Sequence, residues 1–340
     1  MKILIISPTQ SGIGGIAKHV QELTSYLESK NHSVKIISSE NTFTIPINKL
    51  KNPSFMFSSL IKAKFYKNYD IIHAHHPIAA FAFKGNSAKK VVTFHGVYSD
   101  QIEMLHGKTA QNLSNRYEQN ALKWSDAITT GSKEAFDYYS KFQSNIFFIP
   151  NGIDIGSLPS QIDKRFDKQI IFVGRLSKEK GIRTVVECAK NLPANIDLII
   201  VGNGPEQNFV VESIKNYKNI HYLGYQPKEK TIPLIRGSKL LIQPSLAEGI
   251  SATLLESMAC NTPVIATKVG GNIELFNNDN GILIEPENPK ELLNEIISII
   301  DNKERLEKIS KLAFSEVQNY DWSQIGKKYL DLYKELLNLQ

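Results

Sequence analysis

Two basic residues and two glutamates follow apolar segments of this 340-residue chain, where they could bind a phosphorylated ligand. Arg175 and Lys180 come directly after one such segment, in the string VGRLSKEKG. Glu248 and Glu256, with seven residues between them, come after another. Paired cations neutralise the charge that builds on a departing diphosphate, and carboxylates accept hydrogen bonds from sugar hydroxyls. The four side chains together favour an enzyme that moves a sugar from a nucleoside diphosphate to an acceptor.

The segment around the two glutamates predicts a turn followed by a helix. Gly249 permits a tight turn, and Ser251 is a good N-cap for the helix that the string ATLLESMAC predicts. The free N–H groups at such a helix start favour an anion. Glu256 lies in the early turns of that helix, within reach of a ribose diol, whereas Glu248 lies on the loop before it, nearer a transferred sugar. Solvated surface acids are the alternative, which the surrounding strand, turn and apolar helix disfavour.

A metal is not expected at this site. The sequence has no two aspartates separated by a single residue, the pair that many sugar transferases use to bind a metal. Arg175 and Lys180 would then take the place of Mg²⁺. The cluster His73, His75 and His76 offers good metal ligands. Residues this close together at a strand end do not converge easily, however, so a metal there is the less favoured interpretation.

A glycine-rich loop near the N-terminus allows two interpretations. Gly12, Gly14 and Ala17 match the dinucleotide fingerprint G-x-G-x-x-A. The fingerprint should follow its strand directly, yet residues 8–11 intervene. A glycine-rich loop that closes over a substrate explains the pattern equally well.

Two more strand ends carry candidate ligand contacts. Gly202 and Asn203 follow the apolar segment 197–201, and a plain tight turn explains them as well as a ligand contact does. His95, in the string VVTFHG, ends another apolar segment and is placed to face the active site. A structural histidine is the alternative there.

Composition indicates a globular protein with one unusual basic segment. Hydrophobic residues make up 41% of the chain and charged residues 22%. The start of the sequence has no signal-peptide pattern, no apolar run is long enough to span a bilayer, and the two cysteines, Cys188 and Cys260, read as buried apolar residues. We therefore expect a cytoplasmic protein. The net charge is +6, yet residues 41–90 contain eight lysines and one aspartate, which indicates an anionic partner surface.

Short apolar runs alternate with helical patterns along the whole chain, which predicts α/β units with parallel sheets. A stretch rich in Gly, Pro and polar residues after position 149 marks a domain boundary. We expect doubly wound domains at 1–152 and 153–321 that face each other across a cleft, and a C-terminal helix at 322–340 that packs back on the first domain. The expected strands are 2–7, 33–37, 70–73, 90–94, 126–130, 145–149, 169–173, 197–201, 219–223, 239–243, 263–266 and 281–284.

These motifs together resemble the retaining glycosyltransferases of family four, which have the GT-B fold of two Rossmann-like domains. The resemblance runs nearly end to end, and the two glutamates with seven residues between them are its most specific part. The strings that carry it are GGIAKHVQEL, TFHG, IPNGID, FVGRLSKEKG, IIVGNGPE, LGYQP, PSLAEGISATLLESMACNTPVIAT and YDWSQIGKKYLDLYKEL.

The resemblance implies a role for each candidate residue. Arg175 and Lys180 would bind the donor diphosphate. Glu256 would bind the ribose, and Glu248 and His95 would approach the transferred sugar. Further donor contacts would come from Gly14, Gly15, Gly202, Asn203, Gly249, Ile250 and Ser251. The chain departs from the family in having Ile250 where Phe is common, which bears on how the sugar is gripped.

The resemblance defines the reaction better than the substrates. It implies a nucleotide-sugar donor, with a UDP-sugar favoured and a GDP-sugar next, no cofactor or metal, and a lipid-linked or glycan acceptor. Rival interpretations are a sugar-nucleotide epimerase or phosphorylase of the same fold, an NAD-dependent oxidoreductase, and a non-catalytic nucleotide-sugar-binding module.

The basic segment 49–67 interleaves lysines with apolar side chains such as Phe55, Met56, Phe57 and Phe65. Such a stripe predicts contact with an anionic membrane, on the inner face of the cell membrane. An ordinary helix with solvated lysines and aromatics packed in the core is an equal alternative. Nucleic acid is disfavoured, because no nucleic-acid-binding motif accompanies the charge.

Overall fold

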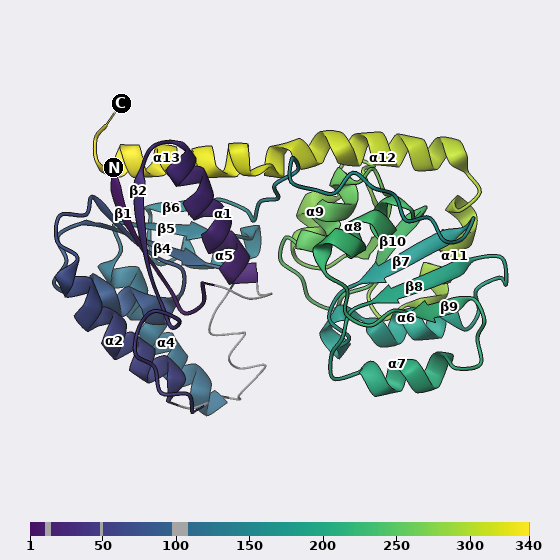
Figure 1. Cartoon of the computed structure of the whole chain (residues 1–340), viewed down its shortest axis with the longest axis horizontal. Helices are drawn as coiled ribbons and strands as arrows, with labels where there is room; N and C mark the ends of the chain where they lie inside the picture. The colour runs from purple at the N-terminus through teal and green to yellow at the C-terminus, as the bar shows by residue number, and fades with distance from the viewer. Residues whose placement is uncertain (11–14, 48–49, 97–107, 340) are drawn as a thin grey trace. The chain divides into compact units, whose positions relative to one another are not determined.

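The computed structural model of the chain describes residues 1–10, 15–47, 50–96 and 108–339, without the side chains of 108–114. These residues form two compact units (Figure 1). Unit 1 contains Met1–Gly152 and Trp322–Gln340, and unit 2 contains Ile153–Asp321. Each unit is an α/β fold built on one parallel sheet of six strands.

The sheet of unit 1 has the strand order β2-β1-β3-β4-β5-β6, so the direction of winding reverses between β1 and β3. Its strands are β1 (Lys2–Ser7), β2 (Ser33–Ser38), β3 (Ile71–Ala74), β4 (Lys89–Phe94), β5 (Ala127–Thr130) and β6 (Ile146–Phe148). Its helices are α1 (Gly15–Ser29), α2 (Lys51–Phe65), the 3₁₀ segment η1 (Pro77–Phe83), α4 (Lys108–Trp124), α5 (Lys133–Tyr139) and α13 (Trp322–Leu336).

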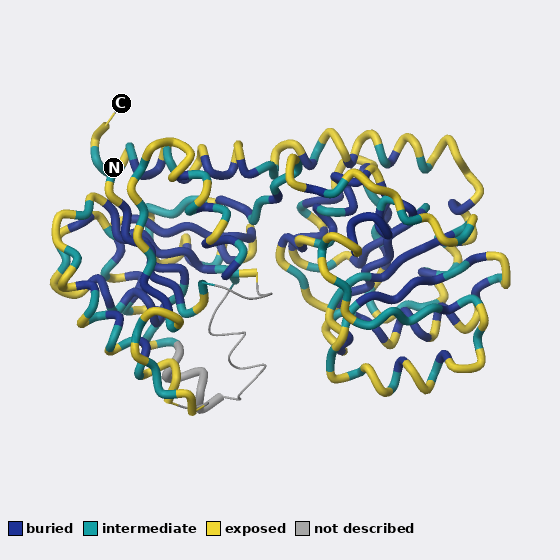
Figure 2. Tube along the Cα trace, in the orientation of Figure 1, coloured by how far each residue is buried: buried dark blue, intermediate teal, exposed yellow. Residues whose placement is uncertain are grey.

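Strand β1 shows why this sheet is buried on both faces. Successive side chains of a strand point to opposite faces. Ile3 and Ile5 pack with α1 and α13, whereas Leu4 and Ile6 pack in the cluster that includes α2 and η1. Both faces are thus apolar, as expected for a parallel sheet covered by helices. Figure 2 shows the strands of both units as buried segments beneath more exposed helices.

The last long helix of the chain, α13, belongs to the core of unit 1. It buries Ile325, Tyr329 and Tyr333 in the cluster that also holds Leu23 of α1. Helices α1 and α13 approach closely at Gly326, where a Cβ atom would lie 2.3 Å from the ring of Tyr26. A glycine therefore permits this close packing.

The sheet of unit 2 has the order β12-β11-β10-β7-β8-β9, with the reversal between β7 and β10. Its strands are β7 (Gln169–Val173), β8 (Asp197–Val201), β9 (Ile220–Tyr222), β10 (Leu240–Gln243), β11 (Val264–Thr267) and β12 (Ile282–Ile284). Its helical segments are η2 (Lys178–Lys180), α6 (Ile182–Ala189), α7 (Gln207–Ile214), α8 (Lys228–Arg236), α9 (Ala252–Ala259), α10 (Gly271–Leu275), α11 (Pro289–Ile299), α12 (Lys303–Val317) and η3 (Gln318–Tyr320).

The strands lie within one residue of the expected ends, and both cysteines are buried. Residues 289–317 form two helices, α11 and α12, and Asn302 caps the second one by accepting a hydrogen bond from the N–H of Arg305. Among the described residues, no helix is long and apolar enough to cross a membrane.

Candidate active site

The reversal of winding in unit 2 places two loops side by side at the carboxyl edge of its sheet. Strands β7 and β10 are neighbours, but the chain leaves them in opposite directions, β7 toward β8 and β10 toward β11. In open α/β sheets, ligands bind in the crevice outside such a switch point. The loop after β7 carries Arg175 and Lys180, and the loop after β10 carries Glu248. The sheet order therefore brings two of the predicted motifs to one place.

Lys180 and Glu248 form an ion pair across this switch point. The Lys180 Nζ lies 2.5 Å from Glu248 Oε1, and the two side chains are 28% and 9% exposed. Ser245 Oγ lies 3.4 Å from the same carboxylate oxygen. The pair is sheltered enough to hold one geometry and open enough to meet a ligand. It is a fixed cation beside a fixed anion at the carboxyl edge of the sheet.

Gln243, the last residue of β10, is part of this cluster and was not among the predicted residues. Its Nε2 donates to Glu248 Oε1 at 2.5 Å and lies 3.0 Å from Ser251 Oγ. All three donors to Glu248 reach Oε1, and no described residue donates to Oε2. A glutamine at the end of an apolar strand is the only sequence signal for this role. The arrangement leaves Oε2 free for a ligand hydroxyl.

The prediction that Ser251 caps the helix after Glu248 through its side chain is wrong. Ser251 does occupy the N-cap position of α9, but its hydroxyl makes no capping hydrogen bond. The hydroxyl instead lies 3.0 Å from Gln243 Nε2 and 3.4 Å from Gln243 Oε1. Gln243 is buried beside it and offers both a donor and an acceptor, so the hydroxyl is used there. The N–H groups at the start of α9 consequently have no side-chain cap.

Close backbone approaches shape the loops around this ion pair. Gly181 has φ of +67°, and a Cβ there would lie 1.7 Å from the carbonyl oxygen of Pro244. Gly202 has φ of +138°, and a Cβ there would lie 1.8 Å from the carbonyl oxygen of Gly174. Only glycine fits at either position. The carbonyl of Asn203 also accepts a hydrogen bond from the N–H of Leu176 at 2.9 Å. The turn after β8 thus supports the loop that carries Arg175 and Lys180.

The other predicted residues of unit 2 lie less tightly together. Arg175 is 67% exposed, and its guanidinium is 3.9 Å from Glu179 rather than part of the Lys180 cluster. Glu256, on α9, lies 3.5 Å from Lys228 at the start of α8. Gly249 is exposed, with open space where a Cβ would stand. The Ile250 side chain is 4% exposed and packs in the core, so only its backbone is available to a ligand.

The predicted residues of unit 1 lie near the reversal between β1 and β3. Gly14 lies outside the described residues, and Gly15 is the exposed first residue of α1. His95 follows β4 directly, and its buried Nε2 has no hydrogen-bond partner among the described residues. His95 is half-buried, and its ring borders those of His19 and His75.

Four histidines of unit 1 cluster behind this strand edge. The ring centroids of His73 and His75 are 4.1 Å apart, and that of His19 lies 5.3 Å from His75 and 5.1 Å from His95. The two ring nitrogens of His73 are both hydrogen-bonded. Nδ1 lies 2.6 Å from the Tyr333 hydroxyl, and Nε2 lies 2.7 Å from Thr93 Oγ1. Neither ring nitrogen of His75 has a described partner.

Burial keeps this histidine cluster neutral. It lowers the pKa of His19 to about 4 and raises the pKa of Tyr329 to about 12. His19 Nδ1–H donates to Asn151 Oδ1 at 3.3 Å, so its Nε2 accepts from the Tyr329 hydroxyl at 3.1 Å. Burial and the neighbouring imidazoles lower the pKa of His75 and His95 well below the usual value.

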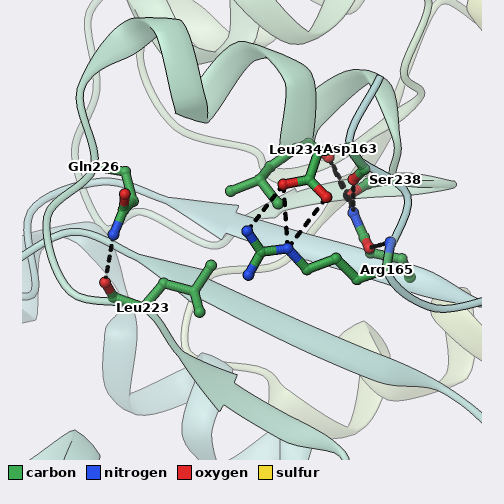
Figure 3. Close-up of polar contacts among 7 residues, drawn as sticks. Asp163, Arg165, Leu223, Gln226, Leu234 and Ser238 are labelled. Atoms are coloured by element: carbon green, nitrogen blue, oxygen red, sulfur yellow. Dashed lines mark hydrogen bonds and ion pairs between the residues drawn. The ribbon is translucent and has the colours of Figure 1, made fainter. Parts of the chain in front are cut away.

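Two other features of the described residues bear on where a ligand could bind. No group of three or more His, Cys, Asp or Glu side chains in the described ranges is arranged to hold a metal ion. A cavity of about 370 Å³ in unit 2 lies beside α8 and contains none of the predicted residues (Figure 3). Its Arg165 is already bound to Asp163 at 2.9 Å, and its Gln226 donates to the carbonyl of Leu223 at 2.7 Å. The guanidinium of this cavity is therefore already paired with a carboxylate.

The two doubly wound units define the protein as a member of the GT-B class of folds. HepE from Anabaena, solved with UDP-glucose, has a TM-score of 0.76 to this chain at 20% identity, with 100% of both chains covered.

Sequence comparison identifies the family. The model for group 1 glycosyl transferases matches residues 159–315, and the model for glycosyltransferase family 4 matches residues 13–157. The chain belongs to this family of glycosyltransferases. It is 27% identical to an uncharacterised glycosyltransferase of Methanocaldococcus jannaschii, over 99% of both chains. It is 22% identical to the phosphatidyl-myo-inositol mannosyltransferase of Mycobacterium leprae, over 98% of this chain and 96% of the relative.

We predict that acid destabilises unit 1 through its buried histidines. An unfolded histidine titrates near 6.5, whereas folded His19 titrates near 4, so the unfolded state binds more protons between these values. Stability is therefore complete above about pH 6.5 and is lost as the pH falls toward 4, by about 3 kcal/mol for one such group. Urea unfolding at pH 7.5 and at pH 5 should show about 2 kcal/mol of this loss for one such group, because pH 5 lies only part of the way from 6.5 to 4.

A pair of variants tests the origin of this acid sensitivity. His75→Phe removes a titrating ring that makes no hydrogen bond, so it should reduce the pH dependence. The control Phe142→Leu changes an exposed aromatic residue of unit 1 that carries no titrating group and should leave the pH dependence unchanged. An unfolding free energy that stays constant between the two pH values would contradict a neutral buried cluster.

Proposed function

We propose that the protein transfers a sugar from a nucleoside diphosphate sugar with retained anomeric configuration and without a metal. The Lys180–Glu248 ion pair at the switch point of unit 2 carries this proposal. Its cation and its anion are fixed 2.5 Å apart at the edge where a diphosphate and its sugar would meet. Retention is what the resemblance to family four implies.

Each charge has a distinct part in the proposed reaction. As the bond between the sugar and the diphosphate breaks, negative charge grows on the leaving oxygens, and Lys180 and Arg175 stabilise it. Arg175 is exposed, and its one ion pair with a described residue is a long one, 3.9 Å to Glu179, so it can turn toward a bound diphosphate. The free Oε2 of Glu248 accepts a hydrogen bond from a hydroxyl of the donor sugar, while Gln243 and Lys180 hold Oε1.

The nucleotide contacts come from neighbouring elements of unit 2. Glu256 accepts hydrogen bonds from the ribose hydroxyls. The turn at Gly202 and Asn203, and the backbone from Gly249 to Ser251, contribute further donor contacts. The uncapped start of α9 supports this assignment, because free N–H groups at a helix start favour anions. In unit 1, Gly15 is a further donor contact and His95 approaches the transferred sugar, as the resemblance to family four implies.

We propose a UDP-sugar as the donor, with a GDP-sugar next, and a lipid-linked or glycan acceptor. The structural similarity to a protein solved with UDP-glucose supports the first choice. The similarity to an enzyme named for phosphatidyl-myo-inositol supports an acceptor carried by a lipid. A cytoplasmic location, where nucleotide sugars are present, is part of the same proposal. The family matches do not favour the epimerase and oxidoreductase alternatives.

The overall proposal is tested by turnover in the presence of a chelator. Because Arg175 and Lys180 supply the positive charge, EDTA should leave nucleotide release and transfer nearly unchanged. Proton NMR of the product should show the same anomeric configuration as the donor. A strict requirement for Mg²⁺ or Mn²⁺, or inverted configuration, would refute this mechanism.

The two cations are tested by substitution with alanine. Arg175→Ala or Lys180→Ala should lower kcat by roughly a hundred- to a thousandfold, the usual cost of removing one preorganised electrostatic contact. Lys178→Ala, in the same loop and exposed, serves as the matched control and should keep full activity. Circular dichroism checks that each variant is folded. Near-normal turnover in either test variant would show that its charge is only part of the surface.

The two glutamates are tested separately by calorimetry. Glu256→Ala should weaken the binding of free UDP or GDP, because the ribose is present whichever sugar is attached. Glu248→Ala should lower the use of the sugar donor more than the affinity for the free nucleotide. Glu187→Ala, an exposed change on α6, is the control. Equal losses of nucleotide affinity in both test variants would disprove the division of roles.

A further inference from the structure

Helix α2 of unit 1 exposes a row of large apolar side chains to solvent. Phe57, Ile61 and Phe65 are 65%, 49% and 81% exposed, and Leu50, just before the helix, is 45% exposed. Single exposed apolar residues are ordinary, but contiguous ones mark interaction surfaces. We call these four residues the apolar row.

The apolar row lies on the face of α2 that points away from the core. Its members are spaced by seven, four and four residues, which places them on one side of a helix with 3.6 residues per turn. The buried side of α2 is formed by Phe55, Ser59 and Ala63, and by helical rotation it lies opposite the apolar row. The helix therefore has two apolar sides, one of which contacts the core.

The segment before α2 extends the same surface. The hydroxyl of Ser58 donates to the carbonyl of Phe43 at 2.7 Å, and the N–H of Ile45 donates to Ser54 Oγ at 2.9 Å. These bonds hold residues 43–45 alongside the helix. Phe43 is 74% exposed and Ile47 is 58% exposed, so two more large apolar side chains are added to this surface.

The charged side chains within the segment that carries the apolar row have only one sign. Lys51, Lys64 and Lys67 are exposed, and Lys62 is half-buried with its ammonium on the carbonyl and side-chain oxygens of Asn41. Residues 41–69 contain no aspartate or glutamate. In the described part of the chain, none of these four lysines forms an ion pair. Lysine side chains can lay their alkyl stems along apolar surface and keep the charge at its edge.

We propose that α2 and residues 43–47 bind the surface of an anionic lipid bilayer. Phe57, Ile61 and Phe65 enter the interface, and the surrounding lysines contact lipid phosphates. This inference rests on the proposed function and extends it. Membrane binding would bring the transferase to a surface that carries a lipid-linked acceptor.

A bilayer fits this surface better than a second copy of the chain. Self-association would bring the same uncompensated lysines of two copies together, and like charges facing each other are costly. An anionic bilayer neutralises them instead. The lysines also surround the apolar residues, which is typical of helices that lie in the plane of a membrane surface.

Flotation with vesicles tests the proposal on the full-length protein. With vesicles of about one part phosphatidylglycerol to two parts phosphatidylcholine, the protein should float with the vesicles, and floating should weaken as salt is raised. It should not float with pure phosphatidylcholine. Phe57→Ser, Ile61→Ser and Phe65→Ser together should lower vesicle affinity at least tenfold. The matched control Phe142→Ser, Ile162→Ser and Ile297→Ser removes three exposed apolar side chains elsewhere and should bind normally.

Reversing the charge of the lysines is the second test of membrane binding. Each lysine near an anionic surface contributes about fivefold in affinity, so reversal of the three exposed lysines, Lys51→Glu, Lys64→Glu and Lys67→Glu together, should lower binding by about a hundredfold or more. A wild-type protein that stays unbound at low salt overturns the proposal. So does vesicle-free dimerisation that the three serine substitutions abolish, because the apolar row would then bind a second copy. Calorimetry with UDP in the absence of vesicles tests the donor site separately, so either proposal can fail alone.

Discussion

The ion pair between Lys180 and Glu248 is the contact around which the site of unit 2 is organised. It exists because the sheet reverses between β7 and β10, so that loops separated by about seventy residues of sequence leave neighbouring strands. Gln243 and Ser245 direct their donors to the same carboxylate oxygen. One carboxylate oxygen is thereby fixed by the protein and the other is left to a ligand. The glycines at 181 and 202 let the surrounding backbone close around this arrangement.

The two units differ in the charge of the side chains at the carboxyl edges of their sheets. Unit 2 presents charged groups that are partly exposed and form ion pairs between separate elements. Unit 1 buries imidazoles that burial keeps neutral, with tyrosine hydroxyls from α13 as their partners. A charged edge stabilises charge that develops during a reaction. A neutral buried edge instead supports structure near neutral pH and makes unit 1 sensitive to acid.

The fold was predictable from the sequence because buried parallel strands appear as short apolar runs between helical patterns. All of the expected strands are present, each within one residue of its expected ends. The sequence also identified Lys180 and Glu248, but it did not indicate that they touch, since this depends on strand order. Gln243 was missed because a polar residue at a strand end has many uses. Ser251 was assigned to the wrong hydrogen bond because the competing partner lies eight residues earlier on a different element.

The contacts of the histidines and aromatic residues were likewise not predictable from the sequence. His19, His73 and His95 lie on three separate elements, and only the adjacency of β3 to β4 and the packing of α1 bring them together. Within α2, Phe55 is buried and Phe57 is exposed, although both stand among lysines. The two residues are only two positions apart, but the rotation of the helix points them to different sides. Composition alone does not show which side faces the core.

The path of the chain also orders the events of synthesis. Unit 1 is interrupted after Gly152 and receives its last helix only after the whole of unit 2 has been made. Until then Leu23, Ile3 and Ile5 lack the cover of Tyr329 and Tyr333. Unit 2, by contrast, is continuous in sequence and can fold as soon as it leaves the ribosome. The later domain in the sequence is therefore the first to be complete, and the nascent first domain must keep an apolar sheet face uncovered while some 170 residues are translated.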